Sequence, residues 1–327
     1  MRKRAWILIP VLLVLTGCAA RTLPVPEATL VPGTDPTLPD AAVEETVRVT
    51  EERTLWFRFL DEPYLAPETR AVAQQSGQSE EMAVLSALFA GPGTQYVELG
   101  SPFPEGTRVL STYRSGRTLL VTVSREWLNP FPDEPEDWQY DPVWQTEVPL
   151  RRKLAMQSLV ATVTDSFDVD EVVVLLEQGE VLSASLRLPQ SWFMDGGGDE
   201  PADAQTRDDA CLLTPSVTAD AIMTCWLRRD WQRLYRYVAA VDPYTGEARP
   251  AYRDFVADME NCAPLTSASC LGWSVSRDGG SCTVSLRVEL RGDDGGARTL
   301  DARVIRLHRS GGVWKISMQS LTGWLEE

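Results

Sequence analysis

The stretch MQSLVATVTDSFDVDEVVVLL, residues 156–176, decides the fold of the first half of the chain. Its first part has the i, i+3, i+4 and i+7 spacing of one apolar helix face, at Met156, Leu159, Val160 and Val163. Its second part, residues 169–176, is rich in β-branched and aliphatic residues, as buried strands are. A helix over residues 148–165 followed at once by such a strand predicts an α+β domain.

Shorter elements are expected before this pair. The predicted strands are residues 54–60, 64–72, 108–113 and 118–124. Ser79 has the chemistry of a helix N-cap and is followed by two glutamates, so a helix is predicted from there to Gly91, where glycine and proline end it. Ser115-Gly116 is a hairpin signal between the last two strands.

The segment DGGGDEPADAQTRDD, residues 195–209, is acidic and rich in residues that break helices and strands. After it, one long helix is predicted, capped by Ser216 or Thr218, and its apolar face holds Leu227, Trp231, Leu234, Tyr235 and Val238. A shorter helix follows over residues 250–260. The remaining predicted strands are residues 273–277, 283–290, 300–308 and 313–319, an antiparallel meander. Helices followed by a curved sheet indicate a second α+β unit, a cone of the NTF2-like or cystatin-like kind.

The N-terminus has the pattern of an exported lipoprotein. Three basic residues precede an apolar run at residues 5–15, which is shorter than the roughly 20 residues that a membrane-spanning helix needs. Leu15-Thr16-Gly17-Cys18 then forms a lipobox, in which the Cys18 thiol accepts a diacylglyceryl group. Two acyl chains anchor a protein stably. The membrane is therefore an expected partner, and we expect the chain at the outer face of the plasma membrane, held by lipid.

These patterns divide the chain into five predicted segments. Residues 18–49 hold five prolines among small and acidic residues, a composition that does not bury a core and is typical of a tether. The predicted segments are a lipoprotein signal peptide (1–17), the Pro-rich tether (18–49), a first domain (50–186), an acidic Gly-rich linker (187–213) and a second domain (214–327).

The net charge bears on the partners of the chain, and its cysteines bear on disulfide formation. The chain has 47 acidic and 31 basic residues and a formal net charge of -16, so it repels phosphate backbones and nucleic acid is not expected as a partner. Cys262 and Cys270 bracket seven residues and are predicted to form a disulfide in the exported protein. Cys211 and Cys225 are the second candidate pair.

We expect no catalytic residues, metal or cofactor. The only histidine is His308, no CxxC pair is present, and the motifs of nucleophile elbows and phosphate loops do not occur. A binding or assembly module is therefore favoured over an enzyme. The alternative is a small-molecule binder or an enzyme that uses the interior of the C-terminal cone. Its candidate lining residues, which at these spacings are more often core, are Trp226, Trp231, Trp273 and Trp314.

The first domain resembles the GerM-type (GerMN) domain of sporulation and spore-germination lipoproteins. The resemblance lies in five ordered blocks: LWFRF (55–59), YLAPETRAV (64–72), LFAGPG (88–93), PFPEGTRVL (102–110) and LVATVTDSFDVDEVVVLLEQGE (159–180). It implies a small α+β domain related to ring-building modules, and a role in cell or spore envelope assembly with envelope or sporulation proteins as partners. It leaves a homo-oligomer open. Where this family carries a second domain of the same type, this chain has the helix-plus-meander unit, and relatives with a different C-terminal domain suggest a regulator of a sensor kinase.

Two smaller features carry hypotheses of their own. Glu68 and Arg70 share one face of a predicted strand, and we expect them to form an exposed ion pair. The insertion at residues 125–148 is acidic and aromatic, and its partner-binding candidates are Phe131, Trp138 and Tyr140. The alternative is that the rings fasten the loop to its own domain, with Trp127 and Trp144 as the fastening residues.

The lipid anchor is directly testable. Replacing Cys18 by Ala removes the acceptor thiol, so the protein is expected to move from the membrane to the soluble fraction, or to accumulate with its signal peptide uncut. Fractionation of cells and the mass of the N-terminal peptide measure both outcomes. Membrane association of a fully processed Cys18→Ala protein contradicts the assignment.

Overall fold

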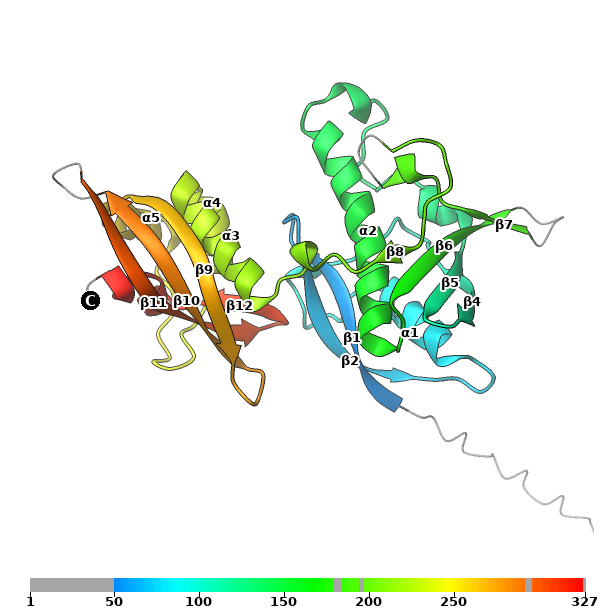
Figure 1. Cartoon of the computed structure of the whole chain (residues 1–327), viewed down its shortest axis with the longest axis horizontal. Coiled ribbons are helices and arrows are strands. Elements are labelled where there is room, and N and C mark those ends of the chain that lie inside the picture. The colour runs from blue at the N-terminus through cyan, green and yellow to red at the C-terminus, as the bar shows by residue number, and fades with distance from the viewer. Residues whose placement is uncertain (1–49, 179–183, 194–196, 292–295, 326–327) are drawn as a thin grey trace, which may run out of the picture. The chain divides into compact units, whose positions relative to one another are not determined.

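The computed structural model describes residues 50–178, 184–193, 197–291 and 296–325. The predicted signal peptide, Cys18 and the tether lie outside these residues, and the division into five segments stays a prediction. The described residues belong to one compact unit, Thr46–Glu327 (Figure 1). Among them, no helix combines the length and the apolar character needed to cross a bilayer.

Residues 50–213, the N-terminal part, contain two sheets. The first has the order β2-β1-β3, with β1 at Thr50–Phe59, β2 at Leu65–Ala73 and β3 at Leu99–Gly100, all antiparallel. The second has the order β4-β5-β6-β7, with β8 also paired to β6. Its strands are β4 (Val109–Ser115), β5 (Thr118–Val123), β6 (Glu171–Gln178), β7 (Ala184–Arg187) and β8 (Gln205–Thr206). Only β5 and β6 pair in parallel in this sheet, because the chain returns to it through a helix.

That helix, α2 (Trp144–Ser166), is the centre of the N-terminal part and runs between the β1–β2 pair and β6 (Figure 1). Residues 154–163 are all buried, so the helix is enclosed on every side rather than on one apolar face. Its polar side chains bond to the backbone of β1: the Trp56 amide donates to Thr162 Oγ1 at 3.1 Å, and Ser158 Oγ donates to the Trp56 carbonyl. The predicted helix and buried strand are confirmed.

The other helix of this part, α1 (Glu80–Phe89), begins as predicted. Ser79 is its N-cap, and its hydroxyl accepts from the Met82 amide at 3.2 Å. The segment predicted as a linker packs on the N-terminal part where it is described, because it contains apolar residues as well as acids. Trp192, Phe193 and Leu213 are buried, and the Leu213 amide donates to the Leu65 carbonyl.

Residues 214–325, the C-terminal part, hold helices and then an antiparallel sheet, so the predicted α+β class is confirmed. The helices are α3 (Pro215–Arg228), α4 (Trp231–Tyr237), α5 (Tyr252–Asn261) and α6 (Met318–Thr322). The sheet has the order β12-β11-β10-β9, with β9 at Leu265–Val275, β10 at Ser281–Arg291, β11 at Ala297–Ser310 and β12 at Val313–Ile316. Figure 1 shows α3 and α4 along β9.

Four boundaries differ most from the prediction, and the first of these is β9, which begins at Leu265 instead of residue 273. The single long helix is two helices, because Arg229 takes a left-handed conformation (φ 55°) and Asp230 caps α4 by accepting from the Arg233 amide at 3.1 Å. Its first cap is Thr214, not Ser216 or Thr218. The last strand ends at Ile316, since Ser317 caps the short helix α6.

The five cysteines within the described residues are free thiols. Strand β9 begins at Leu265, so most of the predicted loop between Cys262 and Cys270 is extended chain in the sheet. Cys211 and Cys225 are buried, and burial raises the pKa of the Cys225 thiol to about 11. Neither predicted disulfide is formed, and both pairings stay predictions for the exported protein.

The two parts meet at the turn between β1 and β2. Glu62, in this turn, is 1% exposed. Its carboxylate accepts from Arg233 Nε at 2.5 Å, from Arg236 Nη1 at 3.0 Å and from the Tyr237 hydroxyl at 3.3 Å. Because an unpaired buried charge is costly, these three donors of α4 fix the turn.

Two further contacts support this junction. The amine of Lys315, on β12, bonds to the Glu98 carboxylate at 2.9 Å and lies 4.7 Å from the centre of the Phe59 ring. Gly312 has a φ of 82°, and a Cβ there would stand 2.2 Å from the Pro67 carbonyl oxygen. Only glycine fits at that position.

Removing the buried carboxylate tests the junction. Glu62→Ala leaves Arg233 and Tyr237 without their carboxylate acceptor and Arg236 with Asp61 alone, and is expected to lower the free energy of unfolding by about 2–4 kcal/mol. The matched control is Asp61→Ala, whose side chain is 68% exposed and pairs with the same Arg236; we expect a loss below about 1 kcal/mol. Urea unfolding of both variants is the measurement, and equal losses contradict this role of Glu62.

Candidate functional site

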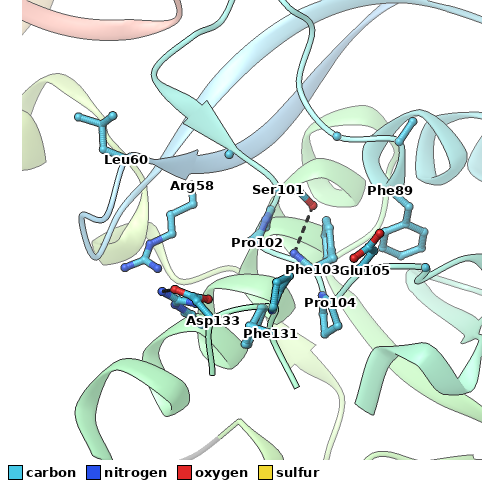
Figure 2. A pocket seen from close by; sticks show the side chains of 16 residues that line it. Arg58, Leu60, Phe89, Ser101, Pro102, Phe103, Pro104, Glu105, Phe131 and Asp133 are labelled. Atoms are coloured by element: carbon cyan, nitrogen blue, oxygen red, sulfur yellow. Dashed lines mark hydrogen bonds and ion pairs between the residues drawn. The ribbon is translucent and has the colours of Figure 1, made fainter. Parts of the chain in front are cut away.

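The N-terminal part has a surface cavity of about 500 Å³ between β1, the end of α1 and the insertion (Figure 2). Three phenylalanines line it: Phe89, Phe103 and Phe131. Three prolines also line it: Pro102, Pro104 and Pro132. Charged side chains stand at the edges, namely Arg58, Glu105, Asp133 and Arg151. The cavity therefore combines a rigid apolar wall with a few charged groups, as ligand sites do.

Aromatic packing holds the apolar wall in place. The rings of Phe89 and Phe103 meet edge to face, with centroids 4.7 Å apart. Trp127 packs behind both of them, at 6.1 Å from Phe89 and 5.5 Å from Phe103, and is fully buried. Trp192 stacks behind Trp127 at 5.6 Å. The wall is therefore part of the core and does not depend on a ligand for its shape.

Glu68 and Arg70 form the back of this site, and the expectation of an exposed ion pair is wrong. Glu68 is buried and accepts from Arg70 Nε at 2.6 Å and from the Gly93 amide at 2.9 Å. Arg70 donates in turn to the carbonyls of Ala87 and Gly91. Glu68 is buried and Arg70 half-buried because the end of α1 packs against them, a contact that period-two spacing along one strand does not reveal.

At the charged end of the cavity, two arginines are paired with carboxylates of the same domain. Arg58 donates to the carbonyls of Asp61 and Glu62, at 2.9 and 3.0 Å, and to the Glu147 carboxylate at 2.7 Å. Arg151 donates to Glu147 at 2.6 Å and to both carboxylate oxygens of Asp133. The hydrogen bond from Arg151 holds the pKa of Asp133 below its ordinary value, so this carboxyl stays ionised.

The three partner-binding candidates of the insertion differ in their exposure. Phe131 is 7% exposed and forms part of the cavity wall, and Trp138 is half-buried. Tyr140 is 86% exposed and points away from the core. Trp127 lies in the core, and Trp144 is half-buried beside Arg151. Whether any of these residues binds a partner stays a prediction.

Two arginines that sequence reasoning missed hold the insertion. The guanidinium of Arg152 lies 5.4 Å from the Trp138 ring centre and 5.5 Å from that of Trp192, and donates to the buried Glu134 at 3.1 Å. Burial lowers the pKa of Arg152. Arg151 lies likewise over Phe131 and Trp144, at 5.5 and 5.2 Å. The sequence offered one signal for this role: Arg151 and Arg152 directly follow an acidic and aromatic segment, residues 126–150, that contains no Lys or Arg.

Across the described ranges, no three acidic, cysteine or histidine side chains gather as metal ligands. His308 is buried on β11, and its burial lowers its pKa. Trp226, Trp231 and Trp314 are buried core residues, whereas Trp273 on β9 is half exposed.

The family model of Germane, described as sporulation and spore germination, matches residues 56–182. This range holds the end of β1, strands β2 to β6, the insertion and all residues that line the cavity. Residues 56–182 are therefore a GerM-type domain, as the five sequence blocks predicted. No curated protein matches the sequence.

Solved structures resemble parts of the chain. The tandem GerMN domains of the sporulation protein GerM from Bacillus subtilis are 17% identical over 51% of this chain, with a TM-score of 0.33, and the chain spans about half of that structure, 49%. A SEC-C motif protein from Rhodopseudomonas palustris is 18% identical over 32% of this chain and 76% of its own (TM-score 0.26). A Δ5-3-ketosteroid isomerase from Mycobacterium sp. is 14% identical over 31% and 88% (TM-score 0.25).

Truncating Arg152 tests how the insertion is held. Arg152→Ala removes two cation–π contacts and leaves the buried Glu134 carboxylate without its cation, with only the Phe131 amide as a donor, so it is expected to lower the free energy of unfolding by about 2–4 kcal/mol and to shift tryptophan emission to longer wavelength. The control is Arg108→Ala, an exposed arginine paired loosely with Glu126 at 3.5 Å, for which no measurable change is expected. An unchanged emission maximum for Arg152→Ala contradicts the proposed bracing.

Proposed function

We propose that this chain is a lipid-anchored, extracytoplasmic and non-enzymatic module that docks a protein partner in the cell or spore envelope. The GerM-type domain at residues 56–182 supports a sporulation-related role. The lipobox at Cys18 supports the anchor and the location. The presentation of Tyr140 and Val143 by the insertion is the observation that carries the proposal.

Tyr140 and Val143 form the tip of the insertion. They are 86% and 71% exposed, although aromatic and β-branched side chains are usually covered. The tip is ordered: Asp141 Oδ1 accepts from the Val143 amide at 2.8 Å, and the Gln145 amide donates to the Asp141 carbonyl at 2.8 Å. A preformed apolar tip loses little conformational entropy on binding, which favours affinity.

Charge indicates the partner's chemistry. Glu136, Asp137 and Asp141 flank the tip and are exposed, whereas Asp133 and Glu134 are paired to arginines of α2. An acidic border around an aromatic anchor complements a basic surface and speeds association with it. The net charge of -16 acts in the same direction at longer range.

The alternative of a ligand site inside the C-terminal cone has less support. The side chains of Val284, Leu286 and Val288 on β10 are fully buried. The ring of Trp226 packs against that of Trp324, with centroids 5.6 Å apart, and both residues are buried. A regulator of a sensor kinase uses a docking surface as well, and it differs from the assembly module in the partner that the tip captures.

A pair of double variants tests the tip. Tyr140→Ser with Val143→Ser removes its apolar surface without touching the arginines beneath it. Tyr113→Ser with Val97→Ser is the matched control, because these residues are similarly exposed on the same domain. In a deletion strain of the source organism, we expect the tip variant to lower the yield of heat-resistant spores about tenfold or more, and the control to restore the normal yield.

The melting temperature of both proteins is measured alongside, since exposed side chains contribute little to stability. Full activity of the tip variant in spore formation, with an unchanged melting temperature, overturns the docking role. A sporulation defect in both double variants shows that the tip has no special part.

A further inference from the structure

We propose that the cavity of the GerM-type domain binds an extended protein segment that combines apolar side chains with a lysine or arginine. This inference rests on the proposed function, because it takes the ligand to be part of a partner protein. It assigns the cavity a second contact, separate from the tip of the insertion.

The walls select apolar side chains. Phe103 and Phe131 are nearly buried, and their rings are held by contacts with Trp127 and Arg151 respectively. Three prolines complete the wall. Aromatic and proline surfaces of this kind bind extended, proline-containing segments well, because such segments are already ordered. A volume of about 500 Å³ accommodates the side chains of a short segment rather than those of a folded domain.

The cations at the cavity edge do not attract an anionic ligand. Arg58 donates to two backbone carbonyls and to the Glu147 carboxylate. Arg151 donates to the Asp133 and Glu147 carboxylates. Because these two carboxylates offset the two guanidinium charges, an incoming carboxylate or phosphate meets no net positive charge at this edge.

Glu105 supplies the remaining charge. It lies beside Phe89, at the opposite end of the cavity from Arg58 and Asp133 (Figure 2). Within the described structure its exposed carboxylate has no hydrogen-bond or ion-pair partner, so it is available to a cation. The apolar wall and this one available carboxylate together define a ligand with apolar side chains and a basic group at one end.

The test uses labelled peptides and fluorescence polarisation on the compact unit, residues 46–327. The probe is a peptide of repeated Leu-Pro-Lys units, and the comparisons are repeated Leu-Pro-Glu and Ser-Gly-Lys units. We expect the first peptide to bind at least about tenfold more tightly than either of the others. Equal binding of the Leu-Pro-Glu peptide overturns the charge assignment, and equal binding of the Ser-Gly-Lys peptide overturns the apolar one.

A blocking variant locates the site. Gly100 lines the cavity, and a Cβ added there meets no atom within 4 Å, so Gly100→Leu places a side chain in the cavity without strain. Gly272→Leu is the matched control on β9, where an added Cβ also meets nothing. We expect about a tenfold loss of Leu-Pro-Lys binding for the first variant and none for the second, with both melting temperatures unchanged. Equal binding by the two variants overturns the site.

Glu105→Gln isolates the charge. It is expected to weaken Leu-Pro-Lys binding about threefold to fivefold, as an exposed ion pair does, and to leave the Leu-Pro-Glu peptide no weaker. Unchanged Leu-Pro-Lys binding removes Glu105 from the proposal. These assays measure the purified protein, so they fail or succeed separately from the spore-yield test of the tip.

Discussion

The buried carboxylate of Glu62 is the interaction on which the arrangement of the chain depends. An ionised group that is 1% exposed needs partners, and α4 supplies them through Arg233, Arg236 and Tyr237. Arg58 closes the same turn from the other side by holding its carbonyls. Arg58 also lines one edge of the cavity. The same arginine therefore contributes both to the junction of the two parts and to the candidate site.

In the insertion, too, buried or half-buried charged side chains are held by oppositely charged partners, but here the central groups are cations. There the half-buried cations Arg151 and Arg152 lie on α2, and the insertion brings Phe131, Asp133, Glu134 and Trp138 to them. Each guanidinium serves two rings and one or two carboxylates, which is the use to which a planar, multivalent cation is suited. A loop with few aliphatic residues is ordered in this way by charge and ring contacts, and its remaining aromatic residue, Tyr140, is left at the surface.

The sequence predicted the local secondary structure well. The helix and strand in residues 148–176, the Ser79 cap and the C-terminal meander follow from spacing along the chain, and the structure contains them. The burial of charged residues was not predictable in this way. Glu62 and Arg233 are 171 positions apart, and Glu68 looked like any exposed acid until the end of α1 covered it. The cavity is assembled from five separate segments, so no single motif indicates it, although three of the five sequence blocks contribute residues to it.

Arg151 links the two candidate contacts physically. Its guanidinium lies over Phe131, which faces the cavity, and over Trp144, which begins α2 beneath the tip. Its bonds to Asp133 and Glu147 fix it from both sides. Because one paired group sets the positions of both surfaces, neither has to be ordered when a partner arrives, and the entropy that flexible loops lose on binding is already lost on folding. A partner that presents a basic, extended segment next to a basic surface therefore meets two preformed contacts held by a single side chain.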